Sequence, residues 1–65
     1  MEILLWQART NKGWVLEQLE KKSGVSKATL NRIENGQTSP MMDVMEKVAK
    51  ALNIRISDLY ESEYK

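Results

Sequence analysis

Apolar residues recur along this chain every three or four positions, the spacing of a helix that buries one face. Three glycines and a single proline divide this pattern into segments. The segments predict five short helices, over residues 2–10, 15–22, 27–35, 40–52 and 56–62. The expected fold class is therefore all-α, with five short helices around one small core in a single domain, residues 1–65.

Residues suited to helix ends support these boundaries. Gly24 follows the second helix, where a left-handed residue ends many helices. Ser26 is a good N-cap for the third helix, and Ser39 can cap the fourth with Pro40 at its first position. Val15 gives the second helix a poor N-cap, because valine offers no acceptor oxygen.

Two groups of apolar residues in the predicted helices must pack against other parts of the protein. The fourth helix carries one stripe that we expect to fill the core: Met41, Met42, Met45, Val48, Ala49 and Leu52. The first helix has more apolar residues than one buried stripe requires, namely Ile3, Leu4 and Trp6. This surplus is either a dimer patch or a cover for the C-terminal segment.

The second and third helices are joined by a four-residue turn, residues 23–26, that contains a glycine. Such a turn suits helices that cross at about 90–120° rather than an antiparallel hairpin. The inward residues of the pair are Leu19, Val25, Leu30 and Ile33. Residues 15–35 are therefore predicted to form a helix-turn-helix motif, the arrangement that places its second helix in the DNA major groove.

The third helix has an outward face without a carboxylate. With Leu30 and Ile33 inward and 100° per residue, the outward residues are Lys27, Ala28, Asn31, Arg32 and Asn35. On the same wheel Glu34 lies about 70° from the inward centre, turned toward the protein. The alternative interpretation is a polar face that only meets solvent.

The outward residue types match what a major groove offers. Arginine and lysine donate to guanine, asparagine pairs with adenine, and an alanine methyl can contact the thymine methyl. The predicted base-reading residues are Lys27, Ala28, Asn31 and Arg32. Predicted donors to phosphate surround them: Ser26, Thr29, Asn35, Gln37 and Thr38. We also expect exposed N–H groups at the start of this helix to attract anions.

Composition excludes most other functions. The 65 residues include no cysteine and no histidine, so thiolate and imidazole chemistry is absent, and we expect no enzyme, metal site or cofactor. Nine basic and six acidic side chains give residues 1–56 a net charge of +3, whereas the tail, about residues 61–65, is acidic. No targeting signal or membrane segment is visible, and no small-molecule ligand is evident, so we expect a cytoplasmic protein.

The segment LEQLEKKSGVSKATLNRIENGQTSP, followed by MEKVAKALNIRISDLY, resembles the λ-repressor-like helix-turn-helix family, also called the XRE or Cro-type family. The resemblance implies sequence-specific binding of double-stranded DNA, as a homodimer on a palindromic operator. It implies base contacts from Lys27, Ala28, Asn31 and Arg32, and phosphate contacts near Asn35 and Gln37. It also implies that Arg9 pairs with Glu34.

Some positions depart from the family pattern. Val15 stands where the family usually has serine or threonine, and Leu16 replaces a glutamine; those polar residues touch the DNA backbone. Glu20 occupies a place normally held by alanine, so it must reach solvent or find a cation such as Lys21 or Lys27. Met41 replaces a small capping residue.

Two functions are compatible with these features. The first is a small, repressor-like transcriptional regulator whose third helix reads DNA. The second is a protein–protein interaction module on the same scaffold, for example an antitoxin or anti-repressor partner, with weak or no DNA binding. The departures at Leu16 and Glu20 and the net charge of only +1 keep the second open.

Overall fold

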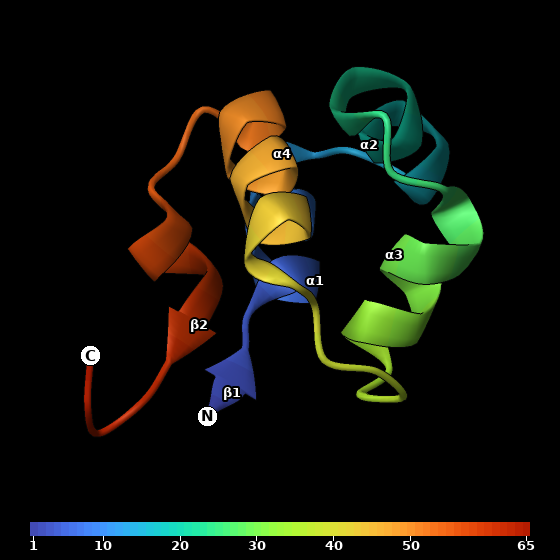
Figure 1. The fold of residues 1–65 in the computed structure, drawn as a ribbon. Helices are drawn as coiled ribbons and strands as arrows, with labels where there is room; N and C mark the ends of the chain where they lie inside the picture. Colours follow the sequence, from blue (N-terminus) through green and yellow to red (C-terminus); the bar gives the residue numbers. More distant parts are fainter.

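The computed structural model describes all of residues 1–65 and shows four α-helices, one 3₁₀ helix and a two-stranded sheet (Figure 1). In chain order the elements are β1 Glu2–Ile3, α1 Leu5–Lys12, α2 Leu16–Ser23, α3 Lys27–Glu34, α4 Met42–Leu52, the 3₁₀ helix η1 Ile56–Leu59 and β2 Tyr60–Glu61. None of the helices is long and apolar enough to cross a bilayer.

The prediction of a fifth α-helix over residues 56–62 is wrong. Only a single 3₁₀ turn forms there, and the chain then extends and pairs antiparallel with the N-terminus, Ile3 opposite Tyr60. The Leu4 N–H donates to the Leu59 carbonyl at 2.7 Å and extends this pairing. Ile3 packs against the core and pairs with the C-terminal segment, and Leu4 bonds to it through its backbone, whereas Trp6 is 54% exposed and covers neither. The first helix begins at Leu5 rather than at residue 2.

The glycine that separates α2 from α3 has the conformation that its position predicted. Gly24 has φ of 76° and donates its N–H to the Glu20 carbonyl at 2.9 Å. A left-handed residue without Cβ ends α2 and lets the chain turn without steric cost. Ser26 caps α3 as predicted, with its Oγ accepting the Thr29 N–H at 3.2 Å.

The start of α4 differs from the prediction. The helix begins at Met42, and its N-cap is Met41 in an extended conformation without a side-chain cap. Met41 and Met42 are 71% and 65% exposed, so the prediction that they fill the core is wrong, whereas Met45 is buried. The three methionines share a helical stripe in the sequence, but the first of them precedes the helix and the second lies at its exposed end.

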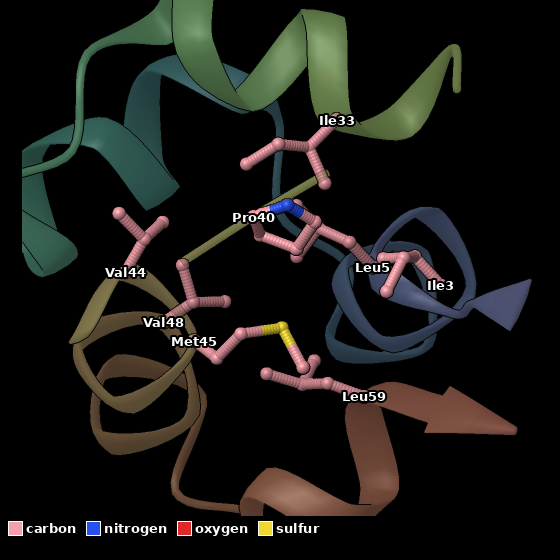
Figure 2. Close-up of a pocket in the computed structure, with 8 residues that line it drawn as sticks. All are labelled: Ile3, Leu5, Ile33, Pro40, Val44, Met45, Val48 and Leu59. Atoms are coloured by element: carbon pink, nitrogen blue, oxygen red, sulfur yellow. The ribbon is translucent and has the colours of Figure 1, made fainter. Parts of the chain in front are cut away.

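Ten buried apolar residues form the core, and they come from every helix and from the turn before α3. They are Leu5, Leu19, Val25, Leu30, Ile33, Met45, Val48, Ala49, Leu52 and Leu59. Pro40 packs beside them instead of opening α4, and it lines a cavity of only about 10 Å³ with Ile33 and Met45 (Figure 2). This space is no larger than a single water molecule needs, so the centre of the fold is closed to ligands.

Candidate nucleic-acid interface

The turn between α2 and α3 fixes the position of α3. Val25 inserts into the core, and its N–H donates to the Ser23 Oγ at 3.1 Å. Leu19 of α2 and Leu30 of α3 are both fully buried, so the two helices share one apolar contact surface. Because the core fixes the side of α3 that carries Leu30 and Ile33, the opposite side faces outward (Figure 1).

All four predicted base-reading residues lie on this exposed side of α3. Lys27, Ala28, Asn31 and Arg32 are each exposed, and no acidic side chain of α3 lies among them. Glu34, the one acid of α3, is turned inward: only 5% of its side chain is exposed. We call Lys27, Ala28, Asn31 and Arg32 the reading face.

The predicted phosphate donors surround the reading face, and the structure shows how several are held. The Ser26 hydroxyl donates to Thr29 Oγ1 at 2.8 Å, and Thr29 is half-buried. The Asn35 amide donates to Asn31 Oδ1 at 3.3 Å, which links the end of α3 to the reading face. Gln37 donates its backbone N–H to the Arg32 carbonyl at 2.9 Å, and its side chain and that of Thr38 are exposed.

Two carboxylates of α2 meet the first residue of α3. The sequence left Lys27 open as a partner of Glu20, but it did not predict the contact with Glu17. Glu17 Oε2 lies 2.6 Å from Lys27 Nζ, with both side chains more than half exposed. Glu20 Oε2 accepts the Lys27 backbone N–H at 2.9 Å. Glu20 therefore bonds to the backbone of Lys27 rather than to an ammonium group.

This arrangement limits the expected attraction of anions to the start of α3 and shifts two pKa values. The N–H groups of Lys27 and Thr29 are not open to an external anion, because Glu20 and Ser26 already accept them, whereas the Ala28 N–H has no acceptor within the protein. The hydrogen bond from Lys27 holds the pKa of Glu17 below its ordinary value, and the same bond raises the pKa of Lys27. Both groups are therefore charged at neutral pH.

Arg9 and Glu34 form the ion pair that the resemblance implies, and it joins α1 to α3. Arg9 Nε donates to Glu34 Oε2 at 2.7 Å, and Arg9 Nη2 donates to Oε1 at 2.9 Å. Arg9 Nη1 also donates to the Trp14 carbonyl at 2.8 Å, so the residues before α2 are held by the same guanidinium. The bonds to Glu34 raise the pKa of Arg9, and this planar bidentate geometry is specific to arginine.

The structure shows what the residues that depart from the family pattern do at the start of α2. Gln18 Oε1 accepts the N–H of Val15 itself at 3.0 Å, whereas the Val15 side chain caps no N–H of the first turn. Val15 is 55% exposed, and Leu16 is half-buried against the core. Leu16 therefore contributes to packing in the place where the family usually has a glutamine.

Comparisons with known proteins agree with this geometry. A helix-turn-helix family model matches residues 7–59. The chain is 42% identical over 53 residues to the HTH-type transcriptional regulator SutR of Escherichia coli (strain K12). This match covers 82% of this chain and 30% of SutR. The chain is 40% identical over 63 residues to the HTH-type transcriptional regulator SinR of Bacillus subtilis (strain 168), covering 89% of this chain and 57% of SinR.

A solved structure shows the same fold. The solution structure of the N-terminal DNA-binding domain of SinR, a master biofilm regulator from Bacillus subtilis, superposes with a TM-score of 0.76 at 34% identity, covering 94% of this chain and 90% of that domain. The chain thus spans between 30% and 57% of the length of the two full-length relatives named here. The matched family model, these relatives and the α2–turn–α3 geometry together show that the chain belongs to the λ-repressor-like, XRE-type helix-turn-helix family.

Proposed function

We propose that this chain binds double-stranded DNA with sequence specificity, as the DNA-binding unit of a repressor-like transcriptional regulator, with α3 in the major groove. The observation that carries the proposal is the reading face: Lys27, Ala28, Asn31 and Arg32 stand exposed with no acid of α3 among them, on a helix whose other side is fixed in the core. The likeness to a domain described as DNA-binding supports it.

Each part of the interface has a role in this proposal. Arg32 and Lys27 donate to guanine O6 and N7, Asn31 pairs with an adenine edge, and the Ala28 methyl contacts a thymine methyl. Phosphate contacts come from residues at both ends of α3: Ser26, Thr29, Asn35, Gln37 and Thr38. Such contacts fix the orientation of the helix on the duplex and carry no sequence information directly.

The proposed binding unit is a homodimer on a palindromic operator, with half-sites about 34 Å apart, one turn of DNA. Selection of bound sequences from a random duplex library tests both claims. A palindromic consensus supports the homodimer, and an enriched single half-site argues against it. If no sequence is enriched, the DNA-reading proposal is wrong, and a protein-interaction module becomes the better explanation.

Arg32→Ala tests the assignment of α3 as the reading helix. We expect a loss of about 1–3 kcal/mol in operator binding and relaxed preference at one base position. Arg55→Ala is the matched control, since Arg55 is also exposed and precedes η1, which lies across the fold from α3 (Figure 1). Equal losses in the two variants would show a general charge effect and would remove the assignment.

A further inference from the structure

We propose that Glu17 is a specificity determinant that holds Lys27 away from non-specific phosphates, so that Lys27 contributes mainly where a base offers it a directional acceptor. The proposal rests on the DNA-binding function proposed above. It starts from the 2.6 Å contact between Glu17 Oε2 and Lys27 Nζ, which pairs a predicted base-reading side chain with an acid of the preceding helix.

The contact neutralises the one ammonium group of the reading face. Non-specific DNA affinity comes from cations that replace counterions at phosphates, and a lysine already paired to a carboxylate has less to gain from this exchange. Arg32, by contrast, has no acid partner in the structure.

The pair is also weak enough to open. The Lys27 and Glu17 side chains are 51% and 61% exposed, and exposed ion pairs of this kind contribute little because water competes for both partners. Guanine presents O6 and N7 at positions fixed by the duplex, which gives a correctly placed ammonium group two acceptors. A matching base can therefore draw the Lys27 ammonium group away from Glu17, whereas a single phosphate competes with Glu17 less effectively.

Glu20 confines the movement of Lys27 to its side chain. Its carboxylate accepts the backbone N–H of Lys27 at 2.9 Å, which holds the first turn of α3 on α2 while the lysine side chain moves. Glu17 and Glu20 lie three residues apart and so share one face of α2, the face beside the start of α3. The two acids act on different atoms of the same residue.

Substitution of Glu17 tests the proposal against random-sequence duplex DNA. We expect Glu17→Gln to tighten this binding about two- to fivefold at low salt. The released lysine should neutralise one more phosphate, so the slope of log affinity against log salt should steepen by about 0.9. The gain for the selected operator should be smaller, so the ratio of operator to random-DNA affinity should fall.

Two further variants separate this effect from general charge. Glu63→Gln makes the same change in net charge in the acidic tail, and the C-terminus lies across the fold from α3 (Figure 1). In a Lys27→Met background, Glu17→Gln should produce no more change than Glu63→Gln does. Equal effects of Glu17→Gln and Glu63→Gln, or a Glu17→Gln effect that persists without Lys27, would overturn the proposal.

Failure of this inference is distinguishable from failure of the proposed function. If the selection enriches an operator and Glu17→Gln changes neither affinity nor salt slope, the role of Glu17 is refuted while the DNA-reading function stands. If Glu17→Gln tightens operator and random duplex equally, Glu17 is no specificity determinant. If no operator is enriched, a Lys27-dependent effect of Glu17→Gln on random duplex still supports the restraint on Lys27, and only the sequence-reading function is lost.

Discussion

The guanidinium of Arg9 holds the Glu34 carboxylate with two hydrogen bonds, of 2.7 and 2.9 Å, and so joins the first helix to the helix that we propose reads DNA. Only 12% of the Arg9 side chain and 5% of the Glu34 side chain are exposed. A carboxylate this buried needs its partner, because the loss of one charge leaves the other desolvated and unpaired.

Arg9→Ala should therefore destabilise the fold strongly. We expect the free energy of unfolding in urea to fall by about 3 kcal/mol, the lower end for breaking a buried pair. Arg55→Ala, which removes an exposed arginine without a salt-bridge partner, should change it by less than about 0.5 kcal/mol. An Arg9→Ala variant as stable as the Arg55→Ala control would show that the pair does not stabilise the fold.

Arg9→Lys should rescue only part of this loss. An ammonium group keeps the charge but cannot make the two parallel bonds to Glu34 and also reach the Trp14 carbonyl. The melting temperature of Arg9→Lys should lie between those of the wild type and Arg9→Ala. Full rescue would mean that charge alone, and not the bidentate geometry, is what α3 needs.

The pair of Glu17 and Lys27 predicts a pH dependence with a definite sign. The pKa of Glu17 is lowered from an ordinary value of 4.5, so its stabilising contribution is complete above pH 4.5 and is lost as the pH falls through the lowered pKa. The pKa of Lys27 is raised from 10.5, so its contribution is complete below pH 10.5 and is lost as the pH rises through the raised pKa.

An NMR titration of the Glu17 carboxyl carbon checks this prediction. In the wild type its midpoint should lie below 4.5, and Lys27→Met should return the midpoint toward that value, because the hydrogen bond from Lys27 is the largest cause of the shift. Lys47→Met is a control, since Lys47 is an exposed lysine of α4. If the midpoint is the same in the wild type and in Lys27→Met, the contact does not persist in solution.

Gly24→Ala should destabilise the fold through the backbone alone. The residue has φ of 76°, and a Cβ there would meet no atom within 4 Å, so the cost comes only from the left-handed conformation. We expect a loss of about 1–2 kcal/mol in unfolding free energy with the fold retained. Gly24→Asn should cost less, because asparagine tolerates this conformation. Equal stability of the alanine and glycine proteins would contradict the prediction.

The C-terminal segment should behave as part of the core. Leu59 is 1% exposed although it lies in a single 3₁₀ turn, so Leu59→Ala should cost about 2–5 kcal/mol. Tyr64→Ala should cost almost nothing, because Tyr64 is 89% exposed. Hydrogen exchange offers a second measurement: the Leu4 amide, bonded to the Leu59 carbonyl, should exchange slowly. Fast exchange at Leu4 would show that the terminal pairing is open.

The sequence by itself determined the helix-turn-helix and the exposed face of α3. These features depend on residues close together in the sequence: a glycine at a left-handed position, a serine as an N-cap and leucines spaced by helical turns. A short stretch of sequence is therefore enough to predict them. The position of Glu34 on the helical wheel likewise follows from the residues on either side of it.

Only the tertiary structure decided what depends on distant residues. Ile3 and Tyr60 become strand partners, and Glu17 meets Lys27, because the packed core brings together segments that no local period connects. The positions of Met41 and Met42 also differ from the local pattern: Pro40 lines the core cavity, α4 begins only at Met42, and both methionines are exposed. Local hydrogen bonding and steric preference involve residues that are near each other in the sequence, whereas the burial of apolar surface brings together residues that are far apart in it.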